Sequence, residues 1–329
     1  MNKRDVFISQ IFETNEKKFE ELAIDICKWQ ATENEIYKQY VDLLKINLEG
    51  INCLEKIPFL PIEFFKTNEI KTGKFTEEII FKSSGTTGQM PSQHFVRDKN
   101  LYEKSFLQSF EMIFGKPSDF CILALLPSYL EREGSSLVNM TQKLIELSNH
   151  IDSGFYLHEF SVLEEKLFSL QKQKQKTILF GVSFALLDFA DAIKEKFPEL
   201  IIVETGGMKG RRKEILREEL HRILKHKLGV EQIYAEYGMT ELLSQAYSSS
   251  NGKFNTPPWM KIFIRDVNDP FNITSKSSSG ALNIIDLANL DSCCFLATAD
   301  AGKINADGSF EVLGRIENVE QRGCNLMIE

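Results

Sequence analysis

The sequence predicts an α/β protein in which helices cover a mostly parallel sheet and a smaller β-rich region follows. Three observations indicate this fold class. From Ile79 onward, short apolar runs alternate with segments of helical spacing, as in strand–helix–strand units. After Pro257-Pro258 the pattern changes to short β segments separated by turns. The first seventy or so residues carry helical spacing alone.

Residues 1–75 are predicted to form a helical N-terminal cap. Apolar residues fall on one helical face at Phe19, Leu22, Ala23 and Ile26. Thr32 and Glu35 have the spacing of a capping box, which predicts a helix start just before Ile36. Two prolines, Pro58 and Pro61, end this region because proline disfavours helix in the residue before it.

Residues 76–256 are predicted to form an α/β core. Buried strands are expected at 120–126, 177–182, 200–204 and 232–237 because these runs are short and nearly all apolar. Helices are expected at 137–147, 184–197 and 215–228. Strands that alternate with helices in this way favour a parallel sheet with both faces covered.

Residues 257–329 are predicted to form a β-rich subdomain with a C-terminal tail. Strands are expected at 261–265, 281–286, 294–298 and 309–313. Asp307-Gly308 and Ser279-Gly280 mark turns within this region.

Composition favours a cytosolic globular protein. The chain has 39 Lys and Arg against 47 Asp and Glu, a net charge of -8, and its basic clusters are short, so nucleic-acid binding is not expected. No run of 18 apolar residues predicts a membrane span, and the N-terminus lacks an apolar signal core. The six cysteines have no metal-binding spacing and are expected to be reduced thiols in the cytoplasm.

The most informative loop is Ser83-Ser84-Gly85-Thr86-Thr87-Gly88, directly after the apolar run 79–81. Four hydroxyls and two glycines at the end of a strand can cradle phosphate oxygens, because glycine lets backbone N–H groups approach a ligand closely. The loop is not a Walker-type P-loop, since no Gly-Lys-Ser/Thr ends it. The alternative is a surface linker, which Ser/Thr/Gly runs often form.

Three further polar groups follow predicted strands, where parallel sheets bind ligands. Gly206-Gly207 leaves room for a flat ligand such as adenine, or forms a simple turn. In Tyr237-Gly238-Met239-Thr240-Glu241 an aromatic ring, a hydroxyl and a carboxylate come together, unless the tyrosine lies in the core and Thr-Glu begins a helix. Asp300 and Arg315 could hold ribose hydroxyls and phosphate, although Asp-x-Gly is also a common turn.

Four motifs resemble, in order and spacing, the successive core motifs of the adenylate-forming ligases, which activate a carboxylate with ATP. They are Ser83 to Gly88, Tyr237-Gly238-Met239-Thr240-Glu241, Thr298-Ala299-Asp300 and Gly314-Arg315. The resemblance covers the chain from about Ile79 to its C-terminus. Within that superfamily, the sequence looks most like the LuxE-type acyl-protein synthetases. This closer resemblance rests on Glu204-Thr205-Gly206-Gly207-Met208-Lys209-Gly210, Pro258-Trp259-Met260, Ile264-Arg265-Asp266 and Arg322-Gly323-Cys324-Asn325-Leu326.

The resemblance implies a site for ATP and Mg²⁺. Ser83, Ser84, Gly85, Thr86, Thr87 and Gly88 would wrap the pyrophosphate end of ATP. Gly206 and Gly207 would border adenine, and Tyr237, followed by Gly238, would pack on it. Thr240 would contact the α-phosphate, Glu241 would bind Mg²⁺, and Asp300 with Arg315 would hold the ribose.

Two departures from the full-length ligases bear on the second half-reaction. Ser92 follows Pro91, where such ligases often carry a lysine. The sequence stops at Glu329, so the resemblance implies the N-terminal-type ligase fold without the mobile C-terminal domain that builds a coenzyme A tunnel. In the LuxE type the acyl group passes instead to a cysteine of the enzyme itself. Here that cysteine is Cys324, with Arg322 beside it to favour the thiolate.

The sequence therefore predicts an enzyme that adenylates a carboxylic acid, expected to be a fatty acid, and transfers the acyl group to a thiol. An acyl-acceptor protein or coenzyme A would be the partner. One alternative is an acyl-CoA or carrier-protein ligase completed by a C-terminal domain from a separate polypeptide. Another is a nucleotide-binding module that has lost catalysis, although the intact pair Thr240-Glu241 argues against it.

Overall fold

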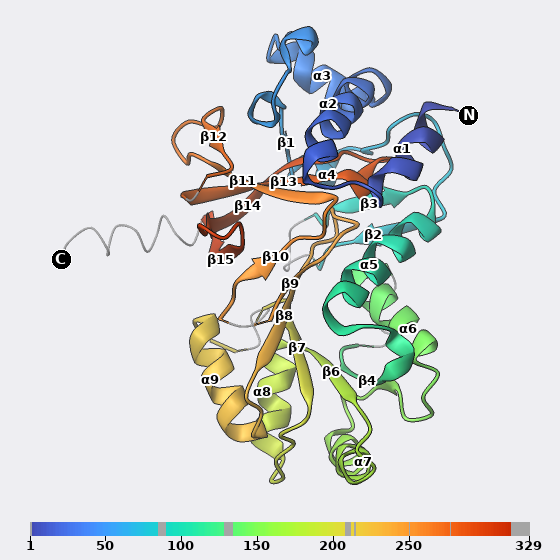
Figure 1. Ribbon diagram of the computed structural model, residues 1–329, viewed down its shortest axis with the longest axis vertical. Helices are drawn as coiled ribbons and strands as arrows, with labels where there is room; N and C mark the ends of the chain where they lie inside the picture. Colours follow the sequence, from blue (N-terminus) through green and yellow to red (C-terminus); the bar gives the residue numbers. More distant parts are fainter. Residues whose placement is uncertain are drawn as a thin grey trace, which may run out of the picture. The chain divides into compact units, whose positions relative to one another are not determined.

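The computed structural model describes residues 2–84, 90–127, 134–207, 212–213, 215–249, 251–276 and 278–316. They fold as two compact units, whose elements are labelled in Figure 1. Unit 1 is built from Met1–Ser105, Thr240–Ser244 and Asn255–Glu329, and unit 2 from Phe106–Met239 and Gln245–Phe254. The five residues Thr240–Ser244 therefore belong to unit 1, although the chain on either side of them belongs to unit 2.

Unit 1 begins with the helices α1 (Lys3–Ile11), α2 (Glu16–Glu33), α3 (Glu35–Leu43), η1 (Leu48–Gly50), η2 (Leu54–Lys56) and α4 (Phe64–Thr67). Asn2, Asn15 and Asn34 cap α1, α2 and α3, each accepting hydrogen bonds from N–H groups of the first turn. The predicted capping box is wrong. Thr32 lies inside α2, where its hydroxyl donates to the Trp29 carbonyl, and Asn34 supplies the cap instead.

The sheet of unit 1 consists of β1 (Leu60–Pro61), β11 (Met260–Arg265), β12 (Ile273–Thr274), β13 (Ser279–Asp286), β14 (Phe295–Ile304) and β15 (Phe310–Arg315). Its order is β12-β11-β13-β14-β15, all antiparallel, and β1 pairs with β14 in parallel. The helix η4 (Leu287–Asn289) follows β13. The predicted N-terminal cap and the predicted β-rich region thus share one core, where Tyr37 of α3 stacks on Phe295 of β14.

A two-stranded antiparallel hairpin also belongs to unit 1. Its strands are β2 (Ile79–Lys82) and β3 (Gln93–Val96), paired from Ile79 opposite Val96 to Lys82 opposite Gln93. Helix α5 (Lys99–Phe114) follows, and the chain passes from unit 1 to unit 2 within it. The segment between the two strands carries the predicted phosphate loop.

Unit 2 contains the predicted parallel sheet. Its strands are β4 (Cys121–Leu125), β5 (Gly154–Phe155), β6 (Thr177–Val182), β7 (Ile201–Thr205), β8 (Ile233–Tyr237) and β9 (Ala246–Ser248), in the order β9-β8-β7-β6-β4-β5. All pair in parallel except β9, which runs antiparallel to β8. The short strand β10 (Phe254–Asn255) closes this stretch of chain.

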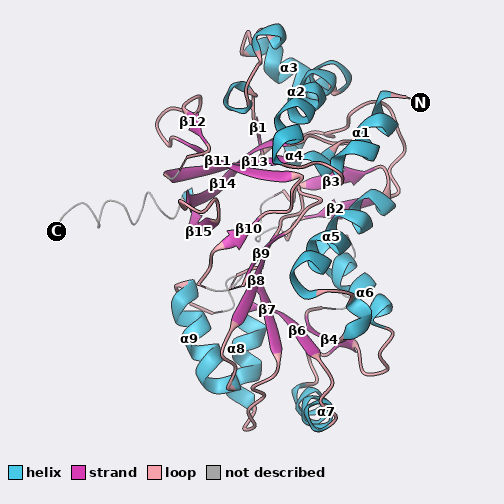
Figure 2. Cartoon of the chain, viewed as in Figure 1, coloured by secondary structure: helices cyan, strands magenta, loops and turns pink. Residues whose placement is uncertain are grey.

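Helices cover both faces of the sheet of unit 2. They are η3 (Pro117–Asp119), α6 (Ser136–Ser148), α7 (Phe160–Lys172), α8 (Ser183–Ala192) and α9 (Arg217–Leu228). Figures 1 and 2 show α8 and α9 on one side of β6–β8 and α6 on the other. Strands β4 and β6 are buried along their whole length, which is why the sequence shows them as unbroken apolar runs.

Phenylalanine supplies much of the core. Nine phenylalanines are among the largest fully buried side chains: Phe65, Phe81, Phe106, Phe110, Phe180, Phe189, Phe197, Phe254 and Phe263. The high phenylalanine content is therefore explained in large part by packing. Among the described helices, none combines the length and the apolar character that a membrane crossing requires.

Candidate active site

The predicted site residues divide between the two units. Unit 1 contains Ser83, Ser84, Thr240, Glu241, Asp300 and Arg315. Unit 2 contains Gly206, Gly207, Tyr237 and Gly238. Gly85, Thr86, Thr87, Gly88 and Cys324 lie outside the described residues.

The base of the phosphate loop is closed by two serines. Ser83 follows β2 and Ser92 precedes β3, and the Ser83 N–H donates to the Ser92 carbonyl at 3.1 Å. The Ser92 N–H donates in return to the Ser83 hydroxyl oxygen at 2.9 Å. This reciprocal pair extends the hairpin by one step and fixes where the loop begins and ends.

Thr240 is held through its main chain by a buried histidine. Nδ1 of His94 in β3 lies 2.9 Å from the Thr240 carbonyl oxygen, so Nδ1 carries the proton and donates. Burial lowers the pKa of His94 to about 4, and His94 is therefore neutral near pH 7. His94 is therefore a structural residue, and Thr240, which it supports, belongs to the candidate site.

Glu241 is a buried carboxylate, 7% exposed. Burial raises the pKa of the Glu241 carboxyl, while a hydrogen bond from the Ser92 side chain and the positive charge of Arg315 act in the opposite direction. The serine that replaces the expected lysine thus contacts the predicted magnesium ligand.

The donor set suits Mg²⁺ bound together with a substrate. Among the described residues, no group of three or more His, Cys, Asp or Glu side chains is arranged to hold a metal ion. Mg²⁺ commonly takes one or two carboxylates, with phosphate oxygens and water as its other ligands. Glu241 as a single hard oxygen donor fits that pattern.

The chain after Glu241 is fixed by two polar residues, Asp286 at the end of β13 and Asn289 at the end of η4. The Asn289 side chain donates to the Glu241 carbonyl at 2.7 Å and accepts the Leu243 N–H at 2.9 Å. The Asp286 carboxylate accepts the N–H groups of Leu243 and Ser244 at 3.0 and 2.9 Å. Hydrogen bonds with these two side chains therefore fix the main chain of the segment Thr240–Ser244 at Glu241, Leu243 and Ser244.

Asp300 and Arg315 meet across two antiparallel strands. They are register partners on β14 and β15, and Nε of Arg315 lies 3.2 Å from Oδ1 of Asp300. The predicted strand end and turn at 298–302 are wrong, because β14 continues to Ile304 and Asp300 lies within it. Asp300 is largely buried, and the Arg315 side chain is 60% exposed. The guanidinium of this pair is therefore accessible to a ligand, whereas the carboxylate is mostly shielded from solvent.

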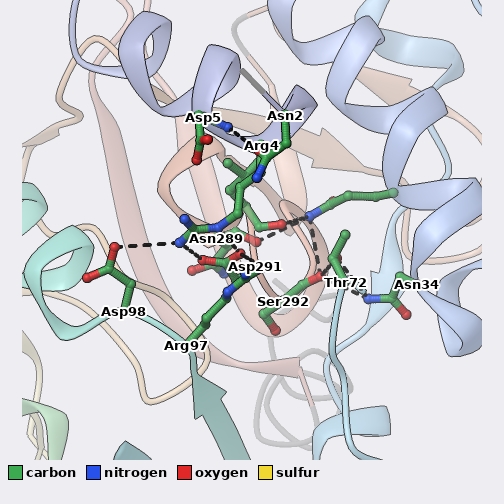
Figure 3. A network of polar contacts seen from close by, with 12 residues as sticks. Asn2, Arg4, Asp5, Asn34, Thr72, Arg97, Asp98, Asn289, Asp291 and Ser292 are labelled. Atoms are coloured by element: carbon green, nitrogen blue, oxygen red, sulfur yellow. Dashed lines mark hydrogen bonds and ion pairs between the residues drawn. The ribbon is translucent and has the colours of Figure 1, made fainter. Parts of the chain in front are cut away.

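Figure 3 shows the polar network that anchors the segment after η4 to the N-terminal helices. The Arg4 guanidinium in α1 binds both oxygens of Asp291, at 2.5 and 2.6 Å. Arg97 approaches Asp291 to 3.7 Å, and Asp98 lies 3.5 Å from Arg4. The Ser292 carbonyl accepts hydrogen bonds from Asn34 and Thr72.

In unit 2, the two glycines after β7 provide space. Gly206 has a φ of 74°, which favours glycine. A Cβ atom built at Gly207 would meet no atom of the described residues within 4 Å. The described residues therefore leave the backbone open at this position.

Tyr237 and Gly238 lie at the end of the next strand. The Tyr237 ring is 8% exposed and packs against Phe254 at 5.9 Å between centroids. Gly238 is required sterically, because a Cβ there would lie 2.5 Å from Oε1 of Glu236. The other oxygen of Glu236 accepts the Thr205 hydroxyl at 2.5 Å, which links the ends of β7 and β8.

A second buried carboxylate lies beneath the glycine pair. Glu204 in β7 is 2% exposed, and the Ser183 hydroxyl donates to its Oε1 at 2.5 Å. Arg217 and His221 of α9 lie 3.6 and 3.8 Å from its other oxygen. The Ser183 hydroxyl is also 3.4 Å from the Gly206 carbonyl, so this cluster contacts the glycine loop directly.

Unit 2 also contains a cavity of about 430 Å³. It is lined by Leu157, His158, Phe160, Ser161, Phe184, Ala185 and Asp188. These residues lie where α7 and α8 begin, after β5 and β6. Four of these residues are apolar and three are polar, and the exposed lining is more polar than apolar.

Sequence reasoning missed Asp286, Asn289, Glu204 and Glu236. A signal was present for each of them. Asp286 and Asn289, together with Asn283, are the polar residues of the otherwise apolar stretch 281–290, and the two glutamates stand near the ends of apolar strands. Buried polar groups require partners, so such positions indicate hydrogen-bonded sites even where no motif is recognised.

Three solved structures are similar to this chain. An open conformation of 2-hydroxyisobutyryl-CoA ligase in complex with 2-HIB-AMP and CoA has a TM-score of 0.62 at 11% identity, over 94% of this chain and 78% of that one. An ATP-bound RpMatB-BxBclM chimera has a TM-score of 0.54 at 16% identity, over 74% and 50%. O-succinylbenzoate coenzyme A synthetase from Bacillus subtilis, in complex with ATP and a magnesium ion, has a TM-score of 0.50 at 19% identity, over 72% and 50%.

These likenesses establish the fold, and the predicted α/β adenylate-forming ligase fold is confirmed. The chain spans about half the length of the last two proteins. No curated protein sequence matches it. The profile of the family described as acyl-protein synthetase, LuxE, matches residues 6–329, and the chain therefore belongs to the LuxE family of acyl-protein synthetases.

Proposed function

We propose that this protein uses ATP to activate a carboxylic acid as an acyl-adenylate and then transfers the acyl group to a thiol. The observation that carries the proposal is the arrangement around Glu241. A buried carboxylate, hydrogen-bonded by Ser92, follows Thr240 in a segment whose main chain is fixed, and it interacts electrostatically with Asp300 and Arg315. A carboxylate oxygen donor beside a hydroxyl and a cation suits a triphosphate with its metal.

In the first half-reaction a carboxylate oxygen of the acid attacks the α-phosphorus of ATP. The bond from the α-phosphorus to the bridging oxygen breaks, and pyrophosphate leaves. Glu241 would hold Mg²⁺, which supplies positive charge to the phosphates. Thr240 would donate to the α-phosphate, and Arg315 with Asp300 would hold the ribose.

In unit 2, Gly206 and Gly207 would border the adenine. The open space above Gly207 supports this role, since a flat base can lie against bare backbone. Tyr237 would contact the base through the small part of its ring that is not packed on Phe254.

In the second half-reaction a thiolate attacks the acyl carbon, a thioester forms and AMP leaves. We propose Cys324 as this thiol. The family description and the short sequence Arg322-Gly323-Cys324 support the assignment. All five cysteines in the described ranges are free thiols, which suits a cytoplasmic location.

We propose a fatty acid as the substrate, and the cavity beside Phe160 and Phe184 as the place for its chain. The two phenylalanine rings, with Leu157, give part of the cavity's lining an apolar surface that an acyl chain could contact. A second candidate acceptor is coenzyme A, because one of the similar ligases was solved with CoA bound.

The test is an acid panel. The protein is incubated with ATP, Mg²⁺ and fatty, aromatic or amino acids, and pyrophosphate release is measured for each. We expect release with fatty acids. Release with none of the acids would contradict the proposal and favour a nucleotide-binding module.

The acceptor is tested by mass spectrometry of the peptide 322–329. We expect one added acyl mass, removable by neutral hydroxylamine, and we expect Cys324→Ser to abolish it while pyrophosphate exchange continues. An unmodified peptide in the presence of acyl-adenylate would assign the thiol to coenzyme A or a partner protein.

A further inference from the structure

The segment Thr240–Ser244 is held by side chains rather than by secondary structure. Asn289 occupies a central position, because it binds the main chain at Glu241 and again two residues later at Leu243. Its Nδ2 donates to the Glu241 carbonyl at 2.7 Å and its Oδ1 accepts the Leu243 N–H at 2.9 Å. Nδ2 also donates to the Cys293 carbonyl at 3.2 Å, so the amide is satisfied in one orientation.

Asp286, three residues before Asn289, also binds the segment Thr240–Ser244. It is fully buried and accepts from the Leu243 and Ser244 N–H groups, from the Ser244 hydroxyl at 2.6 Å, and from the Ala288 N–H at 3.1 Å. Burial raises the pKa of Asp286 to about 6, and these donors oppose that shift by favouring the charged form. Near pH 7 the carboxylate is therefore predominantly ionised.

The turn that carries both residues is itself anchored. Gln30 of α2 donates to the carbonyls of Asn289 and Leu290 at 3.2 and 2.9 Å, and its Oε1 accepts the Cys294 N–H at 2.9 Å. Asp291 in the same turn is bound by Arg4, as Figure 3 shows. The position of Asn289 is thus set by the helices of unit 1.

We propose that Asn289 and Asp286 are positioning residues for Glu241, which fix the main chain directly after it so that its carboxylate faces the metal and phosphates. The inference rests on the proposed function of Glu241. Without Asn289 the Glu241 carbonyl loses its bond, the Leu243 N–H keeps only Asp286, and the carboxylate spends less time in the metal-binding position. The expected defect is specific to Mg²⁺, because neither residue belongs to unit 2, where adenine would bind.

The test compares Asn289→Leu with a matched control from the same region. Asn283 in β13 is also fully buried, and neither atom of its amide has a hydrogen-bond partner within the described parts of the chain. Asn283→Leu is therefore the same change of a buried amide to an apolar group, made where no positioning is proposed. Asn289→Asp is a graded variant that keeps the acceptor for Leu243 and loses the donor to Glu241.

The first measurement is hydrogen–deuterium exchange of peptides that cover 240–244 in the full-length protein. We expect faster exchange in Asn289→Leu than in the wild type or in Asn283→Leu, because the Leu243 and Ser244 amides lose support. Equal exchange in all three proteins would overturn the proposal. This readout is independent of catalysis.

The second measurement is ATP affinity by calorimetry, with and without Mg²⁺ and with no acid present. We expect the gain in affinity that Mg²⁺ gives the wild type to fall about tenfold in Asn289→Leu, the scale of one lost hydrogen bond, with Asn289→Asp between. Affinity without Mg²⁺ should stay unchanged. An equal loss with and without the metal would contradict positioning of Glu241 and indicate general damage.

Failure of the proposed function would look different. If no acid supports pyrophosphate release by the wild type, the ligase proposal fails, whereas exchange at 240–244 and metal-dependent ATP affinity still decide whether Asn289 positions Glu241.

Discussion

The predicted site residues of unit 1 differ in kind from those of unit 2. In unit 1 the site consists of charged and hydroxylated side chains, each held by a neighbour: Glu241 by Ser92, Thr240 by His94, and Arg315 by Asp300. In unit 2 it consists mainly of missing side chains, since Gly207 leaves open backbone and Gly238 leaves room for Glu236. We propose that unit 1 supplies charge for the phosphates and unit 2 supplies shape for the base.

The buried carboxylates near the predicted site residues also differ between the two units. Asp286 in unit 1 accepts four hydrogen bonds from protein donors. Glu204 in unit 2 has one short bond from Ser183, and its other oxygen has no hydrogen-bond partner among the described residues. The fully hydrogen-bonded Asp286 fixes the segment after Glu241, whereas Glu204 is held by one hydrogen bond and by the nearby Arg217.

If unit 1 supplies the charge, the largest effect should come from Glu241. We expect Glu241→Gln to lower acid-dependent pyrophosphate release roughly a hundredfold or more, because a neutral amide is a poor magnesium ligand where charge develops. Glu111→Gln, at an exposed position of α5, is the control. Turnover that is unchanged in Glu241→Gln would remove this residue from the mechanism.

The ribose pair should give the next largest effect. Arg315→Ala and Asp300→Ala are each expected to weaken ATP binding roughly ten- to several-hundred-fold, the scale of a charged hydrogen bond of about 1.5–3 kcal/mol. Lys303 is the matched control, because it forms a register pair with Glu311 on the same two strands. Calorimetric titration with ATP provides the measurement. Wild-type affinity in both Asp300 and Arg315 variants would refute the assignment.

If unit 2 binds the base through open backbone, a larger side chain at Gly207 should be enough to weaken ATP binding. Gly207→Val is expected to fold normally, since its Cβ meets no atom of the described residues within 4 Å, yet to weaken ATP binding by about tenfold through a clash with the base. Gly207→Ala should show a smaller effect in the same direction. Binding of adenosine, which has no phosphates, should fall in parallel. Full adenosine affinity in Gly207→Val would place the base elsewhere.

The smallest expected effect concerns stability. The pKa of His94 is about 4 in the folded state, against an ordinary value of about 6.5 when the chain is unfolded. Between these values the unfolded chain binds a proton that the folded chain does not, so stability is lost as the pH falls. His94→Asn keeps a donor for the Thr240 carbonyl and removes this titration.

The measurement is urea unfolding of both proteins at pH 7 and pH 4.5. The stability of the wild type relative to His94→Asn is expected to drop by about 2 kcal/mol over this interval. Asp286 titrates with the opposite sign, since its raised pKa adds stability as the pH falls, but it is present in both proteins and cancels. A constant difference between the two proteins would mean that His94 titrates normally.

Much of the fold could be predicted because its strongest signals are local. The run 177–182 was predicted as a strand with the bounds that β6 has, since a parallel strand buried on both faces is apolar throughout. Boundaries that depend on tertiary context were less accurate. Asn34 rather than Thr32 caps α3, and β14 continues through Asp300 because β15 pairs with it there.

The site was predictable only where residues lie together in sequence. Thr240-Glu241 stands out as a motif, and its order with Asp300 and Arg315 carried the family resemblance. The partner that holds Glu241 lies 48 residues away at Asn289, and no local pattern connects the two positions. The assigned roles of the site residues remain predictions, and those at 85–88 and 324 lie outside the described residues.

The most direct measurement follows one oxygen atom. The protein is incubated with ATP, Mg²⁺, a thiol acceptor and a fatty acid labelled with ¹⁸O in both carboxylate positions, and the AMP is analysed by mass spectrometry. If the carboxylate attacks the α-phosphorus and the thiol then attacks the acyl carbon, each AMP carries one labelled oxygen. Unlabelled AMP, or ADP in its place, would contradict activation through an acyl-adenylate.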